Sequence, residues 1–182
     1  MITPNEFVIK WKAIWEEEPI KFSADTLEDI EIDEEAKKFL IEAGLPDSAA
    51  PSLSFHAGLP SICEKYGVEE DYSSYKYIGS TGWGDPICLY ENDGSIVYLD
   101  HEENLEYETF INSSIPQLAE SLLAYAQLIE ETQKENGDDA FLDNNIPDRL
   151  KNWIFEELKR IDPAAIEDGF WKAELESLDD EE

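Results

Sequence analysis

The spacing of apolar residues changes twice along the chain, and this change constrains the fold more than any other sequence feature. From Leu53 to Phe110, apolar residues tend to occupy every second position, as in strands with one buried face. On both sides of this block they recur at helical spacing, about every 3.6 residues. Short runs rich in β-branched and aromatic residues predict strands at 53–55, 75–78, 86–90, 95–99 and 107–111. Because Asp93-Gly94 between two runs is typical of a tight hairpin, we expect an antiparallel sheet.

Helices are predicted outside this block from their caps and apolar stripes. Thr3-Pro4-Asn5-Glu6 combines a capping threonine, a first-turn proline and a capping-box glutamate. The predicted helices run from Thr3 to near Glu16, from Asp33 to Ala43, from Ser114 to near Lys134, and from near Pro147 with a bend or restart at Pro163. The expected fold class is therefore α+β, with a central, mostly antiparallel sheet flanked by N- and C-terminal helices.

The length of 182 residues fits one domain, which we expect over residues 1–178, with an acidic disordered tail at 179–182. Aromatic residues make up 12% of the chain, too much ring surface for a disordered protein. Trp153 and Trp171 favour packing of the C-terminal region onto the core. The two cysteines, Cys63 and Cys88, are expected to be small buried hydrophobes rather than a disulfide or zinc pair.

The chain carries 44 acidic and 13 basic residues, a net charge of −31. Residues 174–182 contain six acids and no base, so removing them leaves 38 acids against 13 bases and a charge of −25. The acidity therefore belongs to the folded surface. We expect no direct binding of nucleic acid or of an anionic membrane, because both need a cationic patch. The charge favours a basic partner, although an acidic surface also serves solubility.

The chain has few residues in the patterns that commonly catalyse reactions or bind metals and phosphates. The histidines, His56 and His101, lie outside any zinc-binding or His-Glu-x-x-His spacing. A histidine stands within a run of acidic residues only at Asp100-His101-Glu102-Glu103. Consecutive residues rarely all face one ion, so a solvated turn is favoured over a metal site. The glycine-rich segment 79–85 lacks the Gly-Lys-Ser/Thr ending of a phosphate loop and reads as a bent turn that leaves Trp83 partly exposed. We predict no catalytic, cofactor-binding or metal-binding residues.

Two segments carry a resemblance to a known family: a helix that ends in Phe39-Leu40-x-x-x-Gly44-Leu45-Pro46, and Phe110-Ile111-Asn112-Ser113-Ser114 before the long helix. Together with the order of segments 26–32, 77–80, 87–89, 93–98 and 118–122, they resemble the SUKH superfamily, and most closely its fourth immunity group, over roughly residues 24–130. The resemblance implies an α+β fold without enzymatic activity. It also implies an immunity protein of contact-dependent competition, which binds and neutralises a polymorphic toxin, often a nuclease or deaminase.

The residues shared with the superfamily have capping, turning or packing roles by their position alone: Phe39, Leu40, Gly44, Leu45, Pro46, Gly79 and Ser113. We therefore expect a cytoplasmic, non-enzymatic protein, a monomer or weak dimer, whose partner is a basic toxin domain rather than nucleic acid or membrane. The alternatives are a regulatory or scaffolding module that binds an endogenous protein, and a metal-dependent enzyme that uses the 100–103 run.

Partner contacts are predicted on three acidic turns, on the condition that these turns share one edge of the sheet. The predicted residues are Trp83, Asp85, Glu91, Asp93, Asp100, Glu102 and Glu103. Exposed aromatics ringed by polar groups are plausible anchors for a protein partner.

Overall fold

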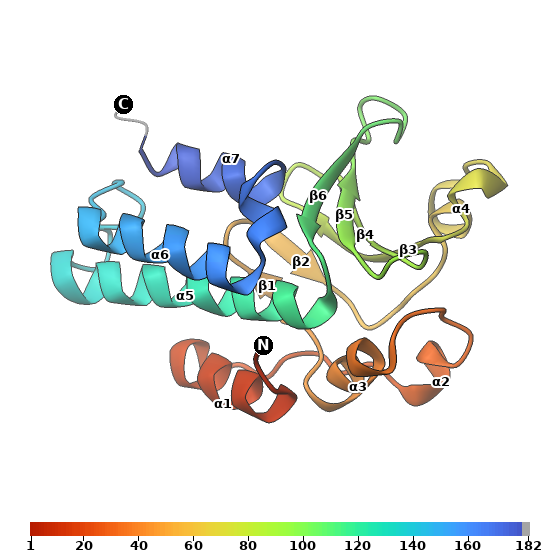
Figure 1. The fold of residues 1–182 in the computed structure, drawn as a ribbon, viewed down its shortest axis with the longest axis horizontal. Coiled ribbons are helices and arrows are strands. Elements are labelled where there is room, and N and C mark those ends of the chain that lie inside the picture. The colour runs from red at the N-terminus through yellow and green to blue at the C-terminus, as the bar shows by residue number, and fades with distance from the viewer. Residues whose placement is uncertain (180–182) are drawn as a thin grey trace.

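The computed structural model describes residues 1–179 and confirms the α+β class (Figure 1). Residues 180–182 of the expected acidic tail lie outside the described residues. The helices are α1 (Pro4–Trp15), α2 (Ala24–Leu27), α3 (Glu34–Glu42), α4 (Ile62–Tyr66), α5 (Ile115–Asn136), α6 (Asp148–Ile161) and α7 (Phe170–Ser177), with 3-10 turns η1 (Glu70–Tyr72) and η2 (Pro163–Ile166).

The sheet is a six-stranded antiparallel meander in which every strand pairs with its neighbours in sequence. Its strands are β1 (Ser48–Ala49), β2 (Leu53–Phe55), β3 (Tyr75–Thr81), β4 (Pro86–Tyr90), β5 (Ile96–Leu99) and β6 (Glu108–Asn112). The predicted hairpin is confirmed: Leu89 pairs with Ile96, and Gly94 has a φ of 79° in the turn between them. The two-residue strand β1 and the short helices α2 and α4 were not predicted.

The N-terminal helices begin and end as their caps predict. Thr3 and Glu6 form the capping box of α1, and the Asp33 carboxylate accepts the N–H of Ala36 at the start of α3. Beyond α3, Gly44 has a φ of 76°, and a Cβ there would lie 2.0 Å from the carbonyl oxygen of Ile20. Only glycine fits a position that combines a left-handed backbone with so close a backbone neighbour.

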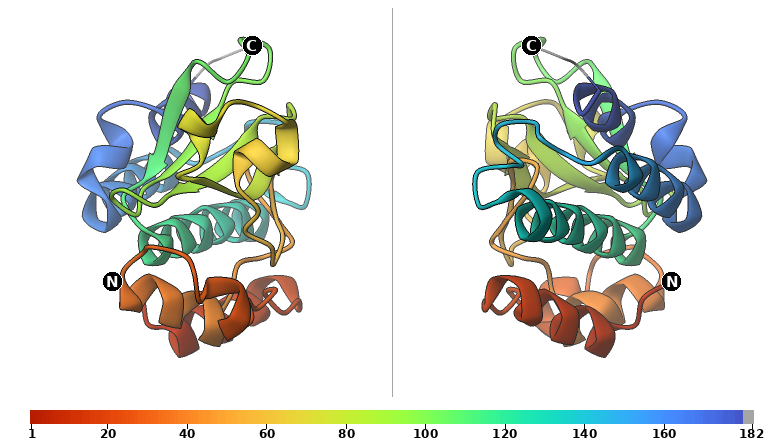
Figure 2. Two further views of the ribbon diagram at one scale, coloured as in Figure 1. Left: turned by 90° about the vertical axis from the view of Figure 1, so that its right-hand side faces the viewer. Right: turned by 90° about the vertical axis from the view of Figure 1, so that its left-hand side faces the viewer.

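Helix α5 lies between the sheet and the N-terminal helices, with α6 alongside it (Figures 1 and 2). Thirteen of its residues are buried, as expected for a helix covered on several sides. The main hydrophobic core extends from Ile2 to Leu178 and includes residues of α5, α6 and α7. Within the described residues, no helix is long and apolar enough to span a membrane.

A smaller apolar cluster lies beside α4 and η1 and is built from Ile62, Tyr77, Cys88, Val97, Leu99 and Leu105. Cys88 is fully buried there, as predicted. The same prediction is wrong for Cys63, which is only half-buried and whose thiol lies 3.0 Å from the carbonyl oxygen of Glu69. It packs against the edge of this cluster and is only partly covered by it.

The C-terminal region is fastened to the sheet by a buried polar network. The carboxylate of Asp162, 1% exposed, accepts hydrogen bonds from the side-chain amide of Asn112 and from Ser113. The Trp171 indole N–H donates to the Asn112 side-chain oxygen at 2.9 Å. Residues 160–178 therefore pack on the β6–α5 junction, in line with the expectation from the tryptophans.

Candidate functional site

The three acidic turns do not share one edge of the sheet. Because consecutive strands run antiparallel, the β3–β4 turn (residues 82–85) and the β5–β6 loop (residues 100–107) lie at one end, and the β4–β5 turn lies at the other. We call residues 82–85 and 100–107 the loop-end surface. It holds Trp83, Asp85, Asp100, Glu102 and Glu103, whereas Glu91 and Asp93 are at the opposite end.

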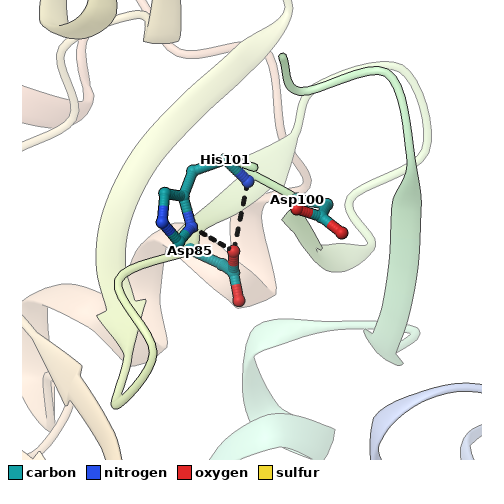
Figure 3. A group of neighbouring side chains, drawn as sticks. All are labelled: Asp85, Asp100 and His101. Carbon is teal, nitrogen blue, oxygen red and sulfur yellow. Dashed lines mark hydrogen bonds and ion pairs between the residues drawn. The ribbon is translucent and has the colours of Figure 1, made fainter. Parts of the chain in front are cut away.

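A hydrogen-bonded pair joins the two segments of the loop-end surface (Figure 3). Asp85 Oδ1 lies 2.7 Å from His101 Nδ1 and accepts the His101 backbone N–H at 3.1 Å. The other oxygen of Asp85 accepts the Thr81 hydroxyl at 3.1 Å. A Cβ at Gly84 would lie 3.7 Å from the His101 ring, so the segments are in close contact. Asp85 is buried and acts as an internal anchor.

The pair shifts both ionisation equilibria toward the charged forms. Burial alone would raise the pKa of Asp85, but hydrogen bonds from His101 and Thr81 outweigh it and lower that pKa. The hydrogen bond to Asp85 and the neighbouring carboxylates raise the pKa of His101. The His101 side chain is itself exposed, so water screens part of this interaction.

The side chains of Asp100-His101-Glu102-Glu103, which the sequence offered as possible metal ligands, do not all face one point. Asp100 Oδ1 accepts the backbone N–H groups of Glu102 and Glu103 at 2.8 and 3.2 Å, which forms a turn, and both glutamates are exposed. Instead Asp85 joins Asp100 and His101, with one ligand atom from each within 4.8 Å of the others. Since both carboxylates already accept N–H groups, this cluster is explained as a loop anchor, and we assign no metal to it.

At the opposite end of the sheet, the Glu91 carboxylate also binds other residues of the chain. Its Oε1 accepts the backbone N–H of Glu31 at 2.8 Å, and its Oε2 lies 3.0 Å from the ammonium of Lys76. Asp93 is exposed and accepts the N–H of Ser95 within its own turn. Of the seven predicted contact residues, Asp85 and Glu91 therefore hold the fold together, while Trp83, Glu102 and Glu103 on the loop-end surface face solvent.

A groove of about 410 Å³ opens beside Trp83, between the β3–β4 turn and α7. Trp83 is 86% exposed at its rim, more than the partial exposure predicted. Tyr98 and Phe170 also line it, and so do the acidic residues Asp168 and Glu174. The sequence pattern predicted only core packing around Trp171, so this wall was missed. Phe170 and Trp171 are indeed buried, but the same turn brings Asp168 and Glu174 to the groove.

The comparisons with known proteins agree with the sequence resemblance. Residues 13–177 match a family model described as SUKH-4 immunity protein. The match extends beyond residues 24–130 and includes the C-terminal helices. No curated protein and no solved structure matches the chain.

Proposed function

Because the chain belongs to the SUKH-4 immunity protein family, we propose that it neutralises a basic, nucleic-acid-processing toxin, a nuclease or a deaminase, by binding it without chemical turnover. It acts as a monomer or weak dimer in the cytoplasm of the cell that makes the toxin. The family supports toxin neutralisation in general, and the charge of the chain supports the narrower class of toxin.

The excess of acidic side chains is the observation that carries this narrower class. Seven of the 13 basic residues form ion pairs with the chain's own carboxylates within the described residues. Few cations are therefore left to offset the acids that face solvent. A toxin that binds nucleic acid needs a cationic substrate surface. A partner of charge −31 is attracted to that surface and competes there with the polyanion.

The loop-end surface is the part of the chain we propose for this contact. It presents Trp83 and Tyr107, which are 86% and 62% exposed, next to the exposed carboxylates of Glu102 and Glu103. Aromatic side chains supply contact area at low entropic cost, and rim charges accelerate association. The Asp85–His101 pair holds the two segments together before binding, which lowers the ordering cost.

The test is a tagged pull-down from the native host, washed at moderate salt and analysed by mass spectrometry. We expect the C-terminal domain of a large secreted protein in stoichiometric amount. The purified domain is then assayed on RNA, DNA and free nucleosides with increasing amounts of this chain, and inhibition should saturate at one equivalent. A basic protein such as cytochrome c, matched in charge to the toxin domain, controls for nonspecific attraction. Recovery of only housekeeping or cell-wall proteins would instead support a scaffolding module.

Affinity for the toxin domain is also measured at several salt concentrations. Between about 50 and 300 mM salt the association rate should fall steeply, because electrostatic steering is screened over about 8–10 Å. An association rate independent of salt would contradict the proposed role of charge, even if inhibition were complete.

A further inference from the structure

The groove beside Trp83 has an aromatic rim and floor and an acidic wall. Trp83 stands at the rim, Tyr98 and Phe170 form the floor with ring centroids 6.5 Å apart, and Glu174 and Asp168 are the acidic residues that line it. Asp168 uses one oxygen to accept the N–H of Gly169, 3.0 Å away. The groove thus combines ring faces with negative charge in one concave surface.

Glu174 is the unusual member of this set. It is half-buried, and its hydrogen-bond partner is the hydroxyl of Tyr125. Burial raises the pKa of Glu174, since an ionised carboxylate loses hydration there without gaining a cation. Among the described residues, neither Glu174 nor Asp168 takes part in an ion pair. A charge-assisted hydrogen bond from a cation outside the chain would offset the hydration that this carboxylate has lost.

Trp83 adds a second reason to expect an occupant. A tryptophan with 86% of its surface in water leaves a large apolar area unburied, and its indole is the aromatic face that binds cations best. The indole and the carboxylates line the same groove. A ligand that fills the groove therefore meets an aromatic face and an anion together.

We infer that this groove receives an arginine side chain of the toxin, stacked on Trp83 and paired with Glu174. The inference rests on the proposed function for the identity of the partner. Arginine fits better than lysine, because its planar guanidinium stacks on indole and presents paired N–H donors to a carboxylate.

The walls of the groove are held in place before anything binds. A Cβ at Gly169 would lie 2.4 Å from the carbonyl oxygen of Phe110, so the start of α7 is pressed directly against β6. Trp171, one residue beyond Phe170, is fully buried and bonded to Asn112. The acidic wall is thus fixed to the sheet, which reduces the cost of ordering the site on binding.

The groove is tested without the toxin by NMR, with acetyl-Gly-Arg-Gly-amide as the probe. The indole N–H signal of Trp83, identified with the Trp83→Phe variant, should shift in a saturable way. The neutral citrulline peptide should bind about tenfold more weakly, since it keeps the shape but loses the charge. The Glu174→Gln variant should weaken arginine binding about fivefold or more. Glu176→Gln removes the same charge from an exposed position of α7 and should change nothing.

Equal shifts with the arginine and citrulline peptides would overturn the inference, and so would unchanged binding by Glu174→Gln. Matching amide spectra of the variants exclude loss of fold as the explanation. The purified toxin domain then separates this inference from the proposed function. Trp83→Ala and Glu174→Gln should each weaken its binding about tenfold. If both variants bind the toxin as the wild type does, the proposed function stands and the groove assignment falls. If no toxin is recovered, the peptide titration still decides the groove.

Discussion

The carboxylate of Asp162 accepts both the backbone N–H and the hydroxyl of Ser113, at 2.7 and 2.9 Å. The two residues are 49 positions apart, and the contact fastens the C-terminal helices to the β6–α5 junction. It gives a structural role to Ser113, one of the residues by which the chain resembles its family.

Replacing Asp162 by alanine should lower the free energy of unfolding by about 3 kcal/mol, because buried donors of Ser113 and Asn112 lose their acceptor. Urea unfolding followed by tryptophan fluorescence measures the change. Asp139→Asn, at an exposed position, is the matched control and should be neutral. A loss below about 1 kcal/mol for Asp162→Ala would show that water replaces the carboxylate without much cost.

The Asp85–His101 pair predicts a pH window of stability. The pKa of His101 is raised from 6.5, so its contribution is complete below 6.5 and disappears as the pH rises through the folded-state pKa. The pKa of Asp85 is lowered from 3.8, so its contribution is present above 3.8 and is lost as the pH falls through the folded-state pKa. The pair should stabilise the loops most between these two ordinary values.

An NMR titration of the His101 ring protons checks this pair. In Asp85→Asn the pKa of His101 should move down toward its ordinary value of 6.5. His56, which accepts the N–H of Gly58 through Nδ1, is the internal control and should titrate as in the wild type. An unaltered His101 titration in the variant would mean that Glu102 and Asp100, and not Asp85, raise the pKa of His101.

Charge reversal on the loop-end surface should slow association with the toxin domain. Glu102→Lys with Glu103→Lys is expected to reduce the association rate severalfold at low salt, because rim charges act mainly on encounter. The control is Glu16→Lys with Glu17→Lys, at the end of α1, which lies on the far side of α5 from this surface (Figure 1). Stopped-flow measurements in which both double variants associate equally slowly would assign steering to net charge alone.

Glutamine at position 174 should stabilise the protein at neutral pH. The pKa of Glu174 is raised from 4.5, so the wild type carries a burial penalty above its folded-state pKa, and the penalty disappears as the pH falls below 4.5. The difference in unfolding free energy between Glu174→Gln and the wild type should therefore be largest near neutral pH and shrink toward acid. Thermal unfolding at a series of pH values measures it. If this difference in unfolding free energy grew as the pH fell, the pKa of Glu174 would be lowered by folding and not raised.

Two glycines separate the effect of a close contact from that of a left-handed backbone. Gly44 and Gly67 have φ values of 76° and 69°, but only Gly44 has backbone atoms where a Cβ would stand. Gly67→Ala should cost about 1 kcal/mol for the backbone conformation alone. Gly44→Ala should cost at least about 2 kcal/mol more, since the backbone at Ile20 must move. Chemical unfolding compares them, and equal losses would show that the Ile20 segment yields easily.

Features fixed by neighbouring residues were predictable from the sequence. The capping box at Thr3 and the Asp93-Gly94 turn each depend on a few adjacent positions, and both stand in the structure as expected. Helix α4 had a comparable signal in its own capping box, Ser61 with Glu64. The helix was missed because its five residues are too few to show an apolar stripe.

The roles of individual carboxylates were not predictable, since they depend on partners distant in sequence. Glu91 looks like any acidic turn residue, yet it accepts the N–H of Glu31 from 60 positions away. Asp85 and Asp162 are buried for the same kind of reason. In a chain with 44 acids, only the folded structure separates those that hold the fold from those left to meet a partner.

Because the strands form a meander, the turns at one end of the sheet can vary in sequence while the pairing of the strands is kept. Each strand finds its register from its sequence neighbour, so residues inserted or exchanged at 82–85 or 100–107 extend a turn without displacing the ladder at the other end of the sheet. If these turns contact the toxin as we propose, a lineage facing a new toxin can alter them and inherit the same scaffold. The main limit on such drift is Asp85 with His101, because a change in either turn has to preserve or replace the bond between them.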